Sequence, residues 1–183
     1  MRNLIFATSN KDKLAEAEVI LDVKLKSTSL EIEEIQSLDI VKVAKAKALA
    51  YFEAFGQPVF VEDVSLEFSG LNGLPGTYIK DFSTALGNEG LCKLARGLKN
   101  RQALARTALV LIDNRKKVHT FIGQVKGCIS RNPNGEGFGW DPIFIPQGSR
   151  KTFGQMSLAE KNKYSMRRRA LGKLQRYLIG HSW

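Results

Sequence analysis

Apolar residues along this chain form short runs that alternate with helical periods, as is typical of an α/β protein. Runs at residues 4–7 and 59–61 predict short buried strands, and a weaker strand is predicted at residues 23–25. Two longer extended stretches, residues 103–112 and 117–129, surround a polar turn and predict an antiparallel hairpin. Early strand–helix units followed by a long hairpin predict an α/β fold with a mixed sheet.

Capping residues and apolar spacing predict the helices between these strands. They are a helix after Ser9 or Asn10, one from Asp39 to Ala54 closed by Gly56, one from Asn88 to Gly97, and a last helix carrying Ala170, Leu171, Leu174, Tyr177 and Leu178, preceded by a capping box of Ser157 and Glu160. Residues 69–77 contain three glycines and a proline, which predicts a loop.

Composition limits the class of protein without choosing a function. The 183 residues carry a formal net charge of +10, which favours a polyanionic partner but equally fits a solvated basic surface. Cys92 and Cys128 have no partner at zinc-ligand spacing, so we expect two buried thiols. The sequence has no signal-peptide pattern and no apolar stretch of transmembrane length, so we expect a cytoplasmic protein without a membrane partner.

A polar hexapeptide, Thr8-Ser9-Asn10-Lys11-Asp12-Lys13, lies where the first strand turns into the first helix. Free backbone N–H groups and the helix dipole favour an anion at such a helix start. Lys13, one turn into the helix, can reach a phosphate as a point charge. The alternative is an ordinary helix cap followed by solvated lysines.

Two acidic pairs are candidates for a metal site. Glu62-Asp63 directly follows the apolar run at residues 59–61, so we expect both carboxylates at a strand end, where they can bind a hard cation. Glu33-Glu34 precedes the second helix. Each pair alone is equally well explained as a solvated acidic segment.

Two later segments carry groups that suit a nucleobase. Phe138-Gly139-Trp140-Asp141 combines aromatic faces for stacking with a carboxylate that can accept hydrogen bonds from base N–H groups. Lys161 and the run Arg167-Arg168-Arg169 supply cationic donors for a carbonyl or a phosphate. Core aromatics at a bend and a basic helix face are the alternatives.

Taken in order, these segments resemble the inosine triphosphate pyrophosphatase family, the Ham1-like enzymes that act on non-standard purine nucleotides. The resemblance runs over essentially the whole chain and rests on an ordered set of motifs: 8–13, Glu34-Ile35-Gln36, Glu62-Asp63, residues 73–80, residues 138–142, Lys151-Thr152-Phe153, Met156, Glu160-Lys161-Asn162, Ser165 and Arg167. It implies one pyrophosphatase domain over residues 1–183, with a long mixed sheet flanked by helices and two lobes around a central substrate cleft.

The resemblance also implies a reaction and a set of roles. The reaction is Mg²⁺-dependent hydrolysis of the α–β phosphate bond of ITP, dITP or XTP, in a homodimer without a specific nucleic-acid partner. The implied roles are proton acceptor for Asp63; magnesium binding for Glu34 and Asp63; triphosphate binding for Thr8, Ser9, Asn10, Lys11, Asp12 and Lys13; and base binding for Phe138, Gly139, Trp140, Asp141, Lys161 and Arg167.

Two positions depart from the family pattern. Val64-Ser65 follows the acidic pair where relatives commonly have Ser-Gly or Thr-Cys, so a side-chain contact beside Asp63 is absent or moved to Ser65. Met166 replaces a histidine of the family, which puts base discrimination in doubt because a thioether donates no hydrogen bond. The alternatives are a pyrophosphatase for modified pyrimidine nucleotides and a basic nucleic-acid-binding module, although the basic residues are spread along the sequence.

Overall fold

The computed structural model describes residues 4–180, and the chain divides into two compact units. Unit 1 comprises Met1–Asp63, Thr107–Gly123 and Arg167–Trp183, and unit 2 comprises Val64–Arg106 and Gln124–Met166. Three long strands contribute residues to both units: β3 (Val59–Phe68), β5 (Gln102–Ile112) and β6 (Val118–Ile129). Within residues 4–180, no helix is both long enough and apolar enough to cross a bilayer. That residues 1–183 act as one domain stays a prediction.

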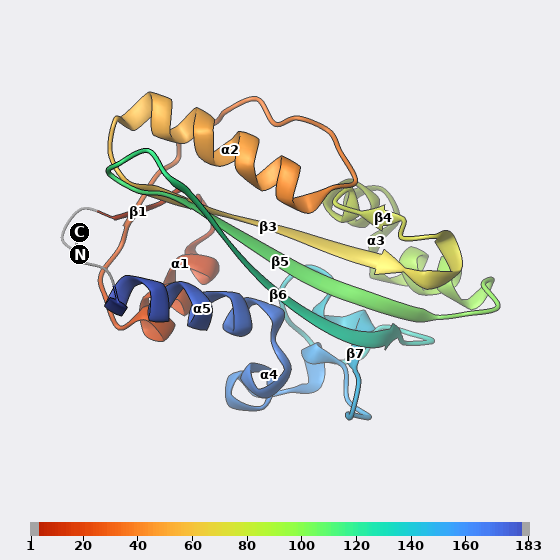
Figure 1. Cartoon of the computed structure of the whole chain (residues 1–183). Helices are drawn as coiled ribbons and strands as arrows, with labels where there is room; N and C mark the ends of the chain where they lie inside the picture. The colour runs from red at the N-terminus through yellow and green to blue at the C-terminus, as the bar shows by residue number, and fades with distance from the viewer. Residues whose placement is uncertain (1–3, 181–183) are drawn as a thin grey trace. The chain divides into compact units, whose positions relative to one another are not determined.

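Unit 1 is built on the strand order β2-β1-β3-β5-β6 (Figure 1). Its remaining elements are β1 (Ile5–Phe6), α1 (Lys11–Leu21), β2 (Lys26–Ser27), α2 (Ile40–Phe55) and, from Arg167 on, α5 (Met166–Gly180). β1 lies parallel to both β2 and β3, with Ile5 opposite Val59. The carboxyl end of β1 leads directly to α1, which places the polar segment 8–13 at that edge of the sheet.

Helices cover both faces of the sheet in unit 1. Because strand side chains alternate between faces, Val59 and Val61 pack on α2 through Ala44 and Ala48. Phe60 points the other way, into a core shared with α1 and α5. Unit 1 therefore has three layers, with α2 on one side of the strands and α1 with α5 on the other (Figure 1).

Unit 2 has the strand order β4-β3-β5-β6-β7, with β3–β4 and β6–β7 antiparallel. Its elements are η1 (Ser69–Leu71), β4 (Pro75–Gly76), α3 (Ile79–Arg96), η2 (Asp141–Ile143), β7 (Phe144–Pro146), η3 (Phe153–Gln155) and α4 (Leu158–Tyr164). One core joins α3 to the strands and to Trp140, Phe144 and Phe153. Cys92 is buried there as expected, whereas Cys128 is half-buried.

Parallel and antiparallel pairs in one helix-flanked sheet confirm the predicted α/β class. The caps at Asn10 and Asp39 and the left-handed C-cap Gly56 are also confirmed. α3 begins at Ile79, earlier than predicted, because a kink at Gly87 (φ 63°, ψ 177°) joins two helical segments. The predicted strand at residues 23–25 is wrong: β2 is formed by Lys26–Ser27.

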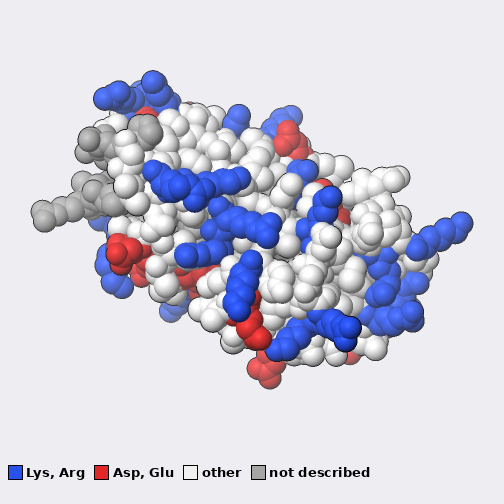
Figure 2. Space-filling view, turned by 60° about the horizontal axis from the view of Figure 1, so that its bottom comes forward, with Lys and Arg blue, Asp and Glu red and all other residues white. Residues whose placement is uncertain are grey.

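The surface carries the excess of positive charge that the composition predicts. On the face drawn in Figure 2, Lys and Arg side chains are more numerous than Asp and Glu side chains. Ion pairs with carboxylates neutralise part of this charge, and several of these ion pairs lie in the candidate active site.

Candidate active site

The start of α1 is organised by its own polar side chains. Asn10 is the N-cap, and its Oδ1 accepts a hydrogen bond from the Lys13 backbone N–H at 2.9 Å. The Thr8 Oγ1 accepts the Asn10 N–H at 3.2 Å. This arrangement places a helix N-terminus at the carboxyl end of β1, which is a favourable position for phosphate oxygens. The other three predicted members of this segment are exposed: Ser9, Lys11 and Asp12.

Glu62 and Asp63 lie in the middle of β3 and not at a strand end, so that expectation is wrong. The strand continues through the carboxylates to Phe68 because its alternation persists, with Leu66 and Phe68 buried. Adjacent strand residues point to opposite faces of a sheet. The two neighbouring carboxylates therefore serve different layers of unit 1 and do not form a shared cation site.

Glu62 belongs to a buried ion cluster on the α1–α5 face. Arg167 donates to it from Nε to Oε2 at 2.7 Å and from Nη2 to Oε1 at 3.0 Å. The Lys13 Nζ lies 3.0 Å from Glu62 Oε1, and Arg167 Nη1 donates to Glu16 Oε2 at 2.6 Å. Two cations thus face two carboxylates in a nearly dry environment.

The cluster determines the charge states of its members. Burial alone would raise the pKa of Glu62, but the positive charges of Arg167 and Lys13 outweigh it and lower that pKa to about 2. Burial would lower the pKa of Arg167, and the charges of Glu62 and Glu16 instead raise it. Glu62 is therefore ionised at all working pH values and is unsuited to act as a proton acceptor near neutral pH.

Asp63, on the α2 face, has the opposite character. Burial raises its pKa to about 6, aided by the negative charges of Glu34 and Glu62, while Lys47 and Lys13 act to lower it. Its Oδ2 atom is buried without a hydrogen-bond partner in the described structure. A carboxylate with a pKa near 6 and an unsatisfied oxygen has the properties of a general base or of a metal ligand.

Glu34 lies near Asp63 and is held by an ion pair with Lys47 of α2. Within residues 4–180, no three His, Cys, Asp or Glu side chains are grouped to hold a metal ion by themselves. Magnesium usually binds one or two carboxylates and completes its shell with water and substrate phosphates. Asp63 with its unpaired oxygen and the partly exposed Glu34 fit such a two-carboxylate donor set.

The predicted base-binding residues of unit 2 form one compact arrangement. Lys161 Nζ pairs with Asp141 Oδ2 at 2.6 Å, and the same oxygen accepts the Phe138 backbone N–H at 3.2 Å. Gly139 between them has φ +59°, which favours glycine. Phe138 is 52% exposed whereas Trp140 is 9% exposed in the core, so only Phe138 offers a face for stacking.

The two departures from the family pattern have structural outcomes. The Ser65 hydroxyl donates a hydrogen bond at 3.0 Å to Oε1 of Glu67, which is a residue of the same strand. Met166 is 5% exposed and packs in the core of unit 2. A histidine at this position would place a polar ring among apolar side chains, so we expect Met166→His to lower stability more than it alters base choice.

Three residues of this arrangement were missed in the sequence. Lys47 and Glu16 have side chains only 16% and 12% exposed. Both lie at helical spacing among the core-facing residues of α2 and α1, where a charged residue signals a buried partner. Asn88 donates from Nδ2 to the Gly139 carbonyl at 2.9 Å and so fixes the base-binding loop. The sequence predicts Asn88 only as a helix start.

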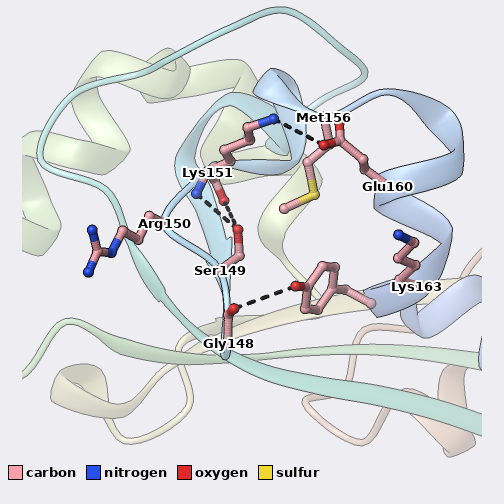
Figure 3. A pocket seen from close by; sticks show the side chains of 8 residues that line it. Gly148, Ser149, Arg150, Lys151, Met156, Glu160 and Lys163 are labelled. Carbon is pink, nitrogen blue, oxygen red and sulfur yellow. Dashed lines mark hydrogen bonds and ion pairs between the residues drawn. The ribbon is translucent and has the colours of Figure 1, made fainter.

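A hollow of about 350 Å³ lies elsewhere in unit 2, between the β7–η3 connection and α4 (Figure 3). Lys151 and Glu160 form an ion pair at its edge, and the Tyr164 hydroxyl lies 3.5 Å from the Gly148 carbonyl. None of the predicted catalytic or substrate-binding residues lines it. The candidate active site is therefore defined by side-chain contacts and not by this hollow.

Comparisons with known proteins identify the family of this chain. The model of the Ham1 family matches residues 4–177. The chain is 40% identical over 179 residues to a dITP/XTP pyrophosphatase of Saccharolobus solfataricus, covering 96% of this chain and 93% of that one. It is 42% identical over 178 residues to an inosine triphosphate pyrophosphatase of Aspergillus fumigatus, covering 96% and 94%. The solved structure of a HAM1 protein from Coxiella burnetii superposes with a TM-score of 0.88 at 26% identity, covering 98% and 99%. The chain therefore belongs to the Ham1 family.

Proposed function

We propose that this protein hydrolyses the α–β phosphate bond of non-standard purine nucleoside triphosphates, releasing a nucleoside monophosphate and pyrophosphate. The names of its relatives in archaea and fungi, dITP/XTP and inosine triphosphate pyrophosphatase, support this substrate class. The chain covers nearly the full length of both relatives, so the proposal concerns the whole protein.

The observation that carries the proposal is the state of Asp63. Its buried carboxyl has a pKa of about 6 and one oxygen without a partner, so at pH 7 it is mostly ionised and still basic enough to accept a proton. In the reaction, Asp63 takes a proton from the attacking water as the new P–O bond forms. Pyrophosphate leaves with the electrons of the broken anhydride bond.

The start of α1 is the proposed triphosphate site. Backbone N–H groups and the hydroxyls of Thr8 and Ser9 donate to phosphate oxygens. Lys13 carries three N–H donors and uses one toward Glu62, so others remain for a phosphate. The fixed ion cluster holds this ammonium group in place before substrate arrives, which favours electrostatic stabilisation.

Magnesium is the proposed cofactor, held by Glu34 and Asp63 together with the substrate phosphates. When bound, it neutralises the charge that develops on the phosphates. The residues of the chain have a separate task. Lys47 holds Glu34 and moderates the pKa of Asp63, so it couples the two carboxylates.

Unit 2 supplies the proposed base recognition. Phe138 stacks on the purine, and the paired Asp141 and Lys161 present an acceptor and a donor in fixed positions. Hypoxanthine and xanthine have a 6-keto group that adenine lacks, and they lack the 2-amino group of guanine. Binding of the wrong base leaves buried polar groups unpaired, which lowers the affinity for that base. Arg167 has five N–H donors and makes three bonds to carboxylates, so two donors are left for the keto group.

The test is pyrophosphate release from ITP, dITP, XTP, GTP, ATP and modified pyrimidine triphosphates, with magnesium and with excess chelator. We expect turnover of the first three nucleotides, dependent on magnesium, with the monophosphate as second product. Preference for a pyrimidine or release of orthophosphate would contradict the proposal. The homodimer and the cytoplasmic location stay predictions, and sedimentation of the purified protein tests the former.

A further inference from the structure

The positive charge of unit 1 is concentrated in two late segments of the sequence. Residues 107–123 and 167–183 contain eight Lys and Arg and a single acidic residue, Asp113. Residues 1–63 of the same unit contain eight Lys and Arg and eleven Asp and Glu. The basic character of unit 1 therefore comes from the tip of the β5–β6 hairpin and from α5.

α5 presents its cations on one side. Its core-facing residues include Ala170, Leu171 and Leu174. The exposed side carries four cations: Arg168, Arg169, Lys173 and Arg176. The helix contains no acidic residue, and the nine residues from the first to the last of these cations span about 12 Å.

The fold joins the hairpin tip to this side of α5. Asp113 is occupied within the turn, where its Oδ1 accepts the Arg115 and Lys117 backbone N–H groups and its Oδ2 lies 2.8 Å from His119 Nε2. The Tyr177 hydroxyl of α5 lies 3.0 Å from the same nitrogen. Lys173 Nζ donates to the Ile122 carbonyl of β6 at 2.6 Å. Exposed Arg115, Lys116 and Lys117 lie at the turn of the hairpin that these contacts tie to α5.

We propose that this α5–hairpin surface binds the phosphodiester backbone of nucleic acid without reading its sequence. The surface is defined by its seven exposed cations: Arg115, Lys116, Lys117, Arg168, Arg169, Lys173 and Arg176. Duplex DNA carries one charge per about 1.7 Å of axis with both strands counted, so about 12 Å of duplex holds roughly seven phosphates, enough for the four cations of α5. A row of exposed cations along a helix matches a charged polymer better than a single triphosphate, which needs a concave site.

The side chains around this surface favour a phosphodiester backbone over unstacked bases or a lipid bilayer as its partner. The aromatic residues beside it, Phe121 and Tyr177, are half-buried and packed on each other, so they offer no platform for unstacked bases. Ile179 is the one exposed large apolar residue of α5, which is too little for insertion into a bilayer. Contact through phosphates alone is expected to be independent of sequence.

The basic residues looked dispersed in the sequence because the hairpin and α5 are about fifty residues apart. The fold joins the two segments, so their separation in the sequence does not exclude a nucleic-acid contact. The proposed surface excludes Arg167, which is turned into the buried cluster with Glu62. Binding of nucleic acid is thus separable from the proposed pyrophosphatase chemistry.

The experiment measures binding of a fluorescein-labelled 30-base-pair duplex by anisotropy at several KCl concentrations. The test variant carries four changes on α5: Arg168→Gln, Arg169→Gln, Lys173→Gln and Arg176→Gln. The control variant removes the same charge from exposed positions of unit 2: Lys93→Gln, Lys99→Gln, Lys126→Gln and Arg131→Gln. Far-ultraviolet circular dichroism and a thermal melt report whether each variant is folded.

We expect wild type to bind two duplexes of unrelated sequence equally, with a dissociation constant of about 10⁻⁴–10⁻⁶ M at physiological salt. The test variant should bind at least tenfold more weakly, with the log–log salt slope reduced by about 3.6 for four lost phosphate contacts. The control should keep the wild-type slope within about one unit. Equal losses in both variants would assign binding to net charge and overturn the proposal. Binding to phosphatidylserine vesicles without duplex binding would overturn it in favour of a membrane surface.

Discussion

Arg167 and Glu62 are joined by two parallel hydrogen bonds, at 2.7 Å from Nε and 3.0 Å from Nη2, with side chains only 11% and 2% exposed. A bidentate pair of this kind is well formed only when both partners are present. Because Arg167 also bonds Glu16, it holds the α1–α5 face of unit 1 together. The residue matched to base binding in the sequence thus has a structural task as well.

Removal of this guanidinium should destabilise the protein. In Arg167→Ala, Glu62 keeps only Lys13 among the described residues as an ion-pair partner in a buried environment, so we expect a loss of about 3–5 kcal/mol in the free energy of unfolding. Urea unfolding measures it, with Arg176→Ala at an exposed position of the same helix as control at about 0.5 kcal/mol or less. A loss below 1 kcal/mol for Arg167→Ala would show that the cluster does not hold this face together.

The pH profile should report Asp63. Its pKa in the metal-free protein is raised to about 6, and a base must be deprotonated, so at limiting magnesium kcat/KM for dITP should be constant above pH 7 and fall about tenfold per unit below pH 6. An ordinary aspartate, with a pKa of about 3.9, would keep activity constant down to about pH 4.5. Circular dichroism at each pH separates titration from unfolding. Constant activity to pH 4.5 in folded protein would exclude Asp63 as the titrating base.

Two neutralising variants should move that profile in opposite directions. Lys47 lowers the pKa of Asp63, so Lys47→Gln should shift the acidic limb to higher pH. Glu34 raises that pKa, so Glu34→Gln should shift the limb to lower pH and also raise the magnesium concentration needed for half-maximal rate. Shifts in the same direction, or none, would contradict the electrostatic coupling of these three residues.

Substitutions of the two aromatic residues of the base-binding loop should have different effects, one on substrate binding and the other on stability. Phe138 is 52% exposed, so Phe138→Ala should raise KM for dITP with little change in thermal stability. Trp140 is in the core, so Trp140→Ala should lower the free energy of unfolding by about 3–5 kcal/mol. Thermal melts and steady-state kinetics on both variants test this. The reverse assignment of the two effects would mean that Trp140 and not Phe138 meets the base.

The sequence predicts local features of the fold well, because caps and apolar spacing are local. Asn10, Asp39 and Gly56 are where their side chains and backbone preferences place them. The sequence predicts too short a strand for β3, because two adjacent carboxylates resemble a strand end when their partners are unknown. Arg167 lies 105 residues from Glu62 in sequence, and only the tertiary fold brings the pair together.

In the candidate site, too, local motifs can be predicted from the sequence, whereas contacts made by the tertiary fold cannot. Its polar segments and acidic pairs are visible in the sequence, and the resemblance to a family orders them. The different fates of Glu62 and Asp63 are not visible, since adjacent carboxylates differ only in which layer they face. The sequence does not predict a role for Lys47, because a lysine on a helix is normally solvated.

Asp63→Asn tests stability and catalysis at once. Because burial raises the folded-state pKa above that of the unfolded chain, protonated Asp63 stabilises the fold fully below about pH 4, and this contribution is lost as pH rises through 6. Ionised Asp63 is therefore unfavourable at pH 7.5. The neutral amide should raise the free energy of unfolding there by about 1–3 kcal/mol, and by less at pH 4.

The most direct measurement is kcat/KM for dITP hydrolysis by wild type and Asp63→Asn at pH 7.5 with saturating magnesium, with unfolding curves on magnesium-free samples of the same preparations. The proposed role of Asp63 as proton acceptor predicts a loss of about 10²–10⁴-fold in a variant that is at least as stable as wild type. A folded Asp63→Asn protein that turns over dITP within about threefold of wild type, far short of the loss expected for a missing general base, would contradict it.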